Sequence, residues 1–115
     1  MFTVLDRLNK TAGIRGSMIV GRDGIVIASD FGVEVDEPAI GAVASSILSS
    51  LEDALRRMNM GQFMRFVITG SDNKIALVDA RRALLMVLLD REVNLGLVSV
   101  EIKDAVDAII EKGQL

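Results

Sequence analysis

The stretch that decides the fold is residues 36–69, which read DEPAIGAVASSILSSLEDALRRMNMGQFMRFVIT. Asp36 is a favourable N-cap residue, and Glu37 and Pro38 suit the first turn of a helix. Because apolar residues then recur at helical spacing, the pattern predicts one long amphipathic helix whose apolar stripe packs on the core. The helix should run from Asp36 to about Met58. The stripe consists of Ile40, Val43, Ala44, Ile47, Leu48, Leu51, Ala54, Leu55 and Met58.

The opposite side of this helix is built from small residues and then charges. Charged pairs four residues apart stabilise a solvated helix, so one interpretation is a face exposed to water. Gly and Ser are poor helix formers, however, and small side chains let another backbone approach closely. We therefore predict a partner-binding face. It consists of Ala42, Ser45, Ser46, Ser49, Glu52, Asp53 and Arg56, with Gly41, Ser50 and Arg57 on the same side.

A strand is predicted directly after this helix, over Phe63–Thr69. Gly61 supports the end of the helix, and the strand carries only Arg65 as a charged residue. If the strand lies inside the sheet, both of its sides are already paired. If it lies at an edge, little guards it against pairing with another chain. At an edge, pairing of identical strands across a two-fold axis would cover it and form one continuous sheet. The predicted dimer-interface residues are Phe63, Arg65, Phe66, Val67 and Thr69.

The rest of the chain predicts four more strands and two terminal helices. Arg22-Asp23-Gly24 lies between two apolar runs and indicates a hairpin turn. The run LLMVLL at residues 84–89 has no polar residue, which favours a central strand covered on both faces. Hairpins imply an antiparallel sheet, and three helices can cover both its faces, which predicts an α+β sandwich in a single domain, residues 1–115. The remaining elements are helices over 1–10 and 94–113 and strands over 17–20, 25–29, 75–80 and 83–89.

Composition excludes several classes of function. The 115 residues include no Cys and no His, which removes disulfides, thiolate metal sites, Cys nucleophiles and the commonest general base. A net charge of −3 argues against nucleic-acid binding, which depends on concentrated Lys and Arg. No signal peptide and no apolar run of about 18 residues is present, so we expect a cytoplasmic protein without membrane insertion. We predict no catalytic residues, no metal site and no cofactor.

Three motif-like patterns do not support a ligand site. The glycine spacing of Gly16–Gly21 matches a phosphate-binding loop, but the required Lys-Ser/Thr pair is missing. Gly13–Gly16 has the G-x-x-G shape of an RNA-binding loop, but it leads into a strand rather than a second helix. Glu34, Asp36 and Glu37 lack the spacing of a calcium loop, and acidic residues are favourable at any helix N-terminus.

Several short segments, taken in order, resemble the Roadblock family. This family comprises dynein-light-chain-like proteins and includes bacterial and archaeal regulators of Ras-like GTPases. The resemblance spans essentially the whole chain. It rests on Leu5 and Leu8, Gly13-Ile14 with Gly16-Ser17, Arg22–Ser29, Met60-Gly61 at the end of the small-residue helix, and Asn94–Val98.

The resemblance implies a profilin-like fold and a protein-binding function. The fold would be a five-stranded antiparallel sheet in the order 2-1-5-4-3, with the long helix on one face and the terminal helices on the other. Family members pair through the third strand and the long helices, and the pair offers a platform to a small GTPase. The expected function is therefore a non-enzymatic, homodimeric regulator of a small Ras-like GTPase. The alternatives are a scaffold subunit of a motor or membrane-associated complex, and a small-ligand sensor.

Overall fold

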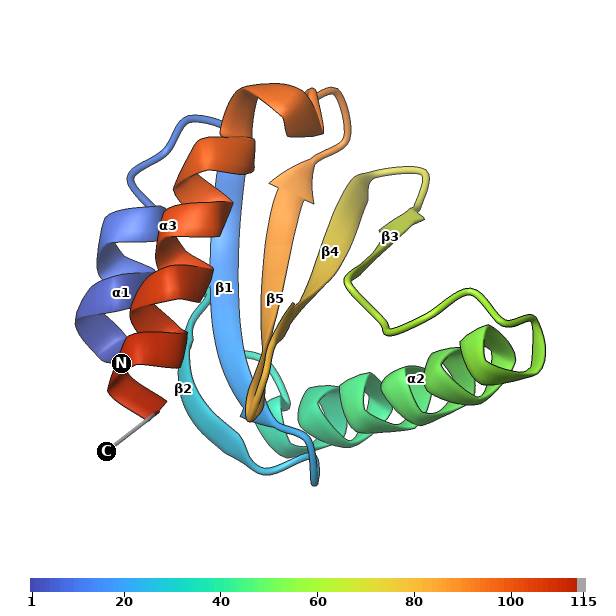
Figure 1. The fold of residues 1–115 in the computed structure, drawn as a ribbon. Helices are drawn as coiled ribbons and strands as arrows, with labels where there is room; N and C mark the ends of the chain where they lie inside the picture. The colour runs from blue at the N-terminus through green and yellow to red at the C-terminus, as the bar shows by residue number, and fades with distance from the viewer. Residues whose placement is uncertain (114–115) are drawn as a thin grey trace.

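The computed structural model describes residues 1–113 and contains three helices and one five-stranded sheet (Figure 1). The sheet is antiparallel throughout, in the order β2-β1-β5-β4-β3. This confirms the predicted fold class and strand order. The elements are α1 (Phe2–Leu8), β1 (Ile14–Gly21), β2 (Val26–Asp30), α2 (Glu37–Arg57), β3 (Arg65–Thr69), β4 (Asn73–Ala80), β5 (Ala83–Asp90) and α3 (Leu95–Gly113).

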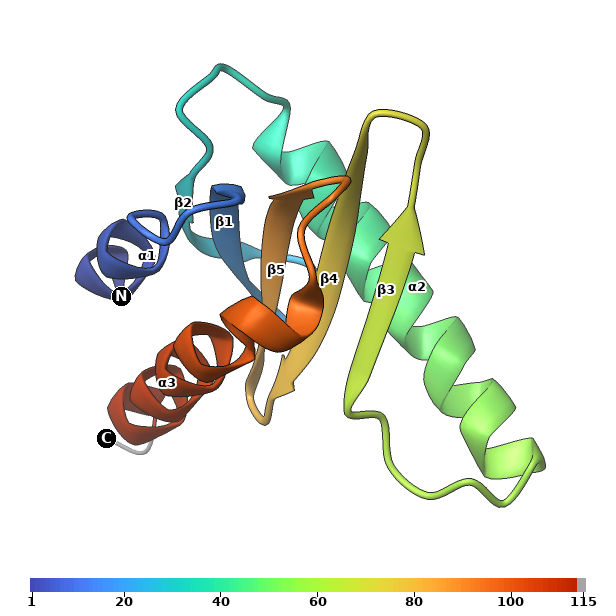
Figure 2. The same ribbon diagram turned by 90° about the horizontal axis from the view of Figure 1, so that it is seen from above.

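The helices lie in two layers, with α1 and α3 on one face of the sheet and α2 on the other (Figures 1 and 2). Strand β5 is central and supplies both layers, because alternate side chains of a strand point to opposite faces. Leu84 and Met86 pack toward α2, whereas Leu85, Val87 and Leu89 pack toward α1 and α3. The unbroken apolar run LLMVLL is therefore explained by burial on both faces of one strand.

Helix α2 begins and ends where the sequence predicts. Asp36 accepts a hydrogen bond from the backbone N–H of Ala39 at 3.2 Å, which satisfies one of the free donors at the helix start. At the other end, Met58 is the C-cap, and Gly61 adopts a positive φ of 89° that favours glycine.

The environment of the α2 side chains differs from the predicted stripe in two respects. Within α2 only Gly41, Ala44 and Leu48 are buried, while Val43 is 56% exposed and the C-cap residue Met58 is exposed as well. The assignment of the whole stripe to the core was therefore wrong. The assignment of Gly41 to the outer face was also wrong, because this residue lies against the turn between β1 and β2.

The close contact at Gly41 explains why the helix contains glycine. A Cβ atom added at Gly41 would lie 2.4 Å from the carbonyl oxygen of Gly24, a distance that real Cβ atoms essentially never show. One turn along the helix, the Ser45 hydroxyl donates a hydrogen bond to the carbonyl oxygen of Arg22 at 2.7 Å. Two of the small residues on α2 therefore serve its packing on the hairpin rather than an outside partner.

Three predicted boundaries also change. Strand β1 begins at Ile14 instead of residue 17, and Ile14 and Gly16 pair with Leu89 and Leu88 of β5. Strand β4 begins at Asn73 instead of residue 75. Strand β3 begins at Arg65, so Phe63 is not a strand residue. The Phe63 side chain is only 5% exposed and packs in the core beneath α2.

The substitution Gly41→Ala tests the contact between α2 and the hairpin. Gly→Ala in a helix interior ordinarily stabilises by about 0.5–1 kcal/mol. Here the new methyl group would push α2 away from Gly24, so we expect a loss of about 1–3 kcal/mol in the free energy of unfolding, measured in urea. Ser46→Ala, at an exposed site on the same helix, is the control and should change stability little. A stabilised Gly41→Ala variant would contradict the contact.

Candidate interaction surface

The two edges of the sheet differ in how well they are protected against pairing with another chain. At the β2 edge, the register shifts and leaves Ile27 as an extra residue, which marks a β-bulge. Asn9 also donates a hydrogen bond to the carbonyl oxygen of Asp30 at 2.7 Å. At the β3 edge, all five residues pair with β4 in an unbroken register. Bulges and covering groups discourage edge pairing, so β3 is the more open edge.

An apolar groove of about 420 Å³ lies between α2 and the half of the sheet that ends at β3. Its walls are aliphatic and aromatic apart from Asp36 at one end, and Val43 and Ile68 face it while 56% and 42% exposed. Exposed apolar surface of this kind is typical of a protein interface. The other lining residues are Phe31, Val35, Ala39, Ile40, Ile47, Phe66, Ile75, Leu77, Met86 and Leu88.

The groove exists because α2 is anchored at one end of the sheet. The backbone of α2 comes closest to β1 and β2, where Gly24 and Gly41 meet. Its C-terminal end extends beyond the edge strand β3 (Figures 1 and 2). The exposed side chains of Met58 and Met60 lie at the C-terminal end of α2, and the exposed Met64 directly precedes β3. Met is an adaptable apolar residue that suits protein interfaces.

Arg22 holds the hairpin, α2 and the β4–β5 turn together. Its guanidinium donates to the Glu52 carboxylate at 3.2 Å, to the Asp79 carboxylate and to the carbonyl oxygen of Arg81. The Asp79 side chain is only 23% exposed, so it depends on this cation for charge compensation. Glu52 therefore has a structural partner within the chain as well as a place on the predicted partner-binding face.

The predicted partner-binding face is divided by the structure. Ala42, Ser46 and Ser49 are exposed and point away from the core. Asp53 and Arg56 lie beside them and form an ion pair at 2.9 Å, and Arg57 pairs with the same carboxylate at 3.0 Å. Ser45 and Glu52 turn toward the hairpin instead. The sequence pattern could not separate these two groups, because it does not show which side of α2 the hairpin covers.

Among residues 1–113 no group of three or more Asp or Glu side chains is arranged to hold a metal ion. No helix in that range is both long and apolar enough to cross a lipid bilayer.

Residues 2–90 match the Roadblock/LC7 domain. The chain belongs to the Roadblock/LC7 family. Two archaeal relatives from Methanocaldococcus jannaschii, MJ0310 and MJ1340, are 44% and 43% identical over 106 residues, covering 92% of this chain and 93% of each relative. The family resemblance predicted from the sequence is therefore confirmed.

Solved structures confirm the profilin-like Roadblock/LC7 fold. A Roadblock/LC7 domain from Streptomyces avermitilis superimposes with a TM-score of 0.92 at 18% identity, covering 100% of this chain and 98% of the other. MglB from Myxococcus xanthus gives 0.92 at 22% identity, covering 98% and 94%. Profilin IB from Acanthamoeba castellanii gives 0.71 at 19% identity, covering 97% and 98%. At these identities the likeness shows the fold alone.

Replacement of Arg22 by Met tests its role as the link between three elements. The variant leaves the half-buried Asp79 without a cation, so we expect a loss of about 1–3 kcal/mol in the free energy of unfolding. Arg15→Met is the matched control, because within residues 1–113 Arg15 pairs only with Asp90 and its side chain is 65% exposed. Its cost should stay below about 1 kcal/mol. Equal losses in urea unfolding would show that Arg22 has no special role.

Proposed function

We propose that this Roadblock/LC7 domain forms a homodimer through β3 and α2. The observation that carries the proposal is the apolar groove, which opens at the unguarded β3 edge. Pairing of two β3 strands about a two-fold axis would satisfy the free edge and join the two sheets. In this arrangement Arg65, Phe66, Val67 and Thr69 lie at the junction. Phe63 is excluded because its side chain fills the core of its own protomer.

The same two-fold axis would place the C-terminal end of α2 from one copy in the groove of the other copy. An axis perpendicular to the sheet keeps both α2 helices on one face of the joined sheets. Since the C-terminal end of α2 extends beyond β3, it would reach over the sheet of the second copy (Figure 2). Met58 and Met60 are exposed at that end and would bury their side chains against the partner's groove, near Val43 and Ile68. The solved MglB structure with a tetrameric arrangement, TM-score 0.85, supports self-association of this fold.

We further propose that the dimer is a non-enzymatic regulator of a small Ras-like GTPase. Family membership supports this function, since the family includes such regulators. The exposed residues Ala42, Ser46, Ser49 and Arg56, together with the half-buried Asp53, form the contact surface. In the dimer, two such faces lie side by side on the joined sheet. Small side chains and a charged border allow the switch loops of the GTPase to approach closely. If the surface binds the GTP-bound and GDP-bound forms of these loops with different affinities, it would shift the GTPase between the two states.

Substitution of groove residues tests the dimer. Val43→Lys and Ile68→Lys each place a charge in the groove at a site already exposed in the protomer, so folding should be retained. Each variant should weaken dimerisation at least about tenfold, because burying an aliphatic side chain contributes about 1.5–3 kcal/mol. Light scattering across micromolar concentrations measures the change. Ala42→Lys, on the outer face of the same helix, should remain dimeric.

A monomeric wild-type chain at these concentrations would refute the dimer. Unchanged dimerisation of Val43→Lys and Ile68→Lys would move the interface away from the groove. Because the outer-face control carries the same new charge, the comparison separates a local effect from a general change in net charge.

The charge reversal Arg56→Glu tests the GTPase contact. Arg56 is exposed and lies outside the groove, so we expect an intact dimer but at least about tenfold weaker binding to the cognate GTPase. The measurement is a titration of Ras-like GTPases, loaded with GDP or with a non-hydrolysable GTP analogue, together with their hydrolysis rates. Arg91→Glu, on an exposed loop before α3, is the matched control. Equal binding by both variants would place the contact elsewhere.

If the GTPase binds with the same affinity in both nucleotide states and its hydrolysis rate does not change, the scaffold role is favoured instead. A scaffold subunit needs affinity for a partner but no difference in affinity between the two nucleotide states. The two nucleotide forms in the same titration therefore distinguish regulation from simple attachment.

A further inference from the structure

The face of the molecule opposite α2 carries a second surface that the proposed dimer and GTPase contact leave free. Helix α3 has 19 residues and α1 has seven, so α3 is longer by about 18 Å. The C-terminal end of α1 lies beside Glu101, Asp104 and Ala105, which share a groove with it. The first turns of α3 extend past that point without a neighbouring helix on this side.

Two apolar side chains lie on this uncovered part of α3. Leu97 is 79% exposed and Val100 is 64% exposed, whereas the core side of α3 is formed by Val98, Ile102 and residues 105 and 109. Leu and Val are seldom the best choice for a solvated helix face, where straight-chain polar residues combine helix propensity with solubility. The fold itself therefore does not account for Leu97 and Val100.

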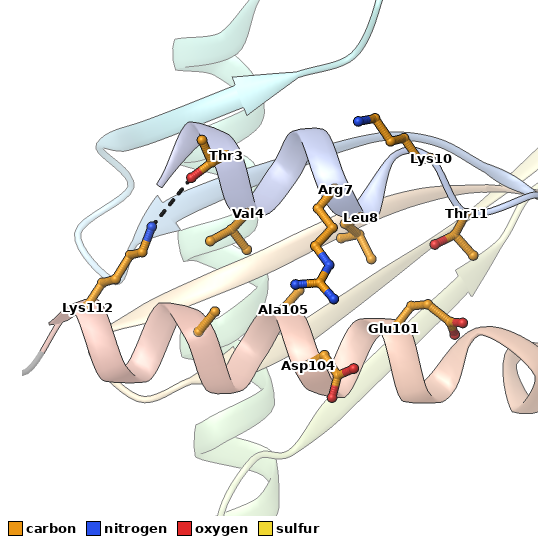
Figure 3. A pocket seen from close by; sticks show the side chains of 11 residues that line it. Thr3, Val4, Arg7, Leu8, Lys10, Thr11, Glu101, Asp104, Ala105 and Lys112 are labelled. Atoms are coloured by element: carbon orange, nitrogen blue, oxygen red, sulfur yellow. Dashed lines mark hydrogen bonds between the residues drawn. The ribbon is translucent and has the colours of Figure 1, made fainter.

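The groove between α1 and α3 continues this apolar surface. It has a volume of about 570 Å³, and Val4, Leu8, Ala105 and Ala108 contribute its apolar lining. Figure 3 shows Glu101 and Asp104 on the α3 side, and Arg7 of α1 pointing across the groove toward α3. At about 100° per residue, Leu97, Val100, Glu101 and Asp104 lie within roughly 100° of one another around the helix axis.

The two carboxylates on this face form no ion pair within the described residues. No Lys or Arg nitrogen of residues 1–113 lies within 4.0 Å of a carboxylate oxygen of Glu101 or Asp104. By contrast, Asp107 is held by Lys103 at 2.8 Å; this hydrogen bond, together with the charges of Asp107 and Asp104, raises the pKa of Lys103 above its ordinary value. Arg7, Lys10 and Lys112 also line the groove. The occupant that complements Glu101 and Asp104 therefore places its cations on the α3 side, one to two helical turns from an apolar group.

We propose that Leu97, Val100, Glu101 and Asp104 form a docking surface for a cationic amphipathic helix of another protein. The partner helix would lie along α3 beyond the end of α1, with apolar residues on Leu97 and Val100. Its Lys or Arg side chains would reach Glu101 and Asp104. Because α1 and α3 cover the sheet face opposite α2, this surface stays accessible in the proposed dimer (Figures 1 and 2).

The probe for this surface is a labelled amphipathic peptide of Leu and Lys, about 18 residues long so that it can form a helix. Fluorescence anisotropy with the full chain measures its affinity at several salt concentrations. We expect the double variant Leu97→Ser/Val100→Ser to bind about tenfold more weakly, since two apolar contacts are lost. Both sites are exposed, so the fold should be unaffected, which circular dichroism verifies.

Charge variants give the decisive comparison. Glu101→Gln/Asp104→Asn should weaken binding and reduce its salt dependence, because exposed charge attraction is screened by salt. Arg7→Gln should strengthen binding, since it removes the cation that faces these carboxylates across the groove. The matched control Glu34→Gln/Asp72→Asn changes the net charge by the same amount at exposed sites elsewhere.

Each possible result either supports or overturns the docking surface. Loss of binding in the Leu97/Val100 and Glu101/Asp104 variants, with tighter binding by Arg7→Gln and an unchanged control, supports the docking surface. An equal loss in the control variant would show attraction to the acidic chain as a whole and overturn the proposal. Unchanged peptide binding by Leu97→Ser/Val100→Ser would also overturn it. In a separate measurement, binding of the wild-type chain to phosphatidylcholine vesicles but not to the peptide would show that the surface meets lipid, and would overturn the proposal as well. None of these outcomes depends on the GTPase or on the dimer.

Discussion

The contact between α2 and the β1–β2 hairpin is the constraint on which the rest of the interaction surface depends. Two glycine backbones meet there, and no Cβ fits at Gly41. Arg22 strengthens the same junction by joining α2 to the β4–β5 turn through Glu52 and Asp79. Because the helix is fixed close to the sheet at this end, it diverges from the sheet toward β3 and leaves an apolar groove.

This geometry brings together three features of the surface around α2 and β3. The groove, the unguarded edge of β3 and the exposed Met side chains at the end of α2 all lie on one side of the protomer. A second copy would cover all three at once, which is economical because one two-fold axis repeats every contact. The outer face of α2 is then left for a different partner. Under the proposed function, separate sides of one helix would serve folding, self-association and recognition.

The layer formed by α1 and α3 extends this division to the opposite face. Its uncovered residues combine exposed apolar groups with carboxylates that form no ion pair within residues 1–113. A small protein with two such faces could bind two other proteins at once. Regulation and scaffolding therefore need not be exclusive for a protein of this shape, since each function can use a different face.

The sequence by itself determined the fold class and the start and end of α2, and the family resemblance implied the strand order. The fold class and the helix ends depend on local signals: Asp36 as a cap, the Asp-Gly turn, and the unbroken apolar run of β5. Only the tertiary structure decided which small residues face inward. Gly41 and Ser45 are small residues like those on the exposed face of α2. The hairpin that covers them is distant in sequence, so the spacing of apolar residues in α2 does not reveal the contact. Phe63 and the exposed Val43 were misplaced for the same reason, because burial depends on where α2 crosses the sheet and not on helical spacing alone.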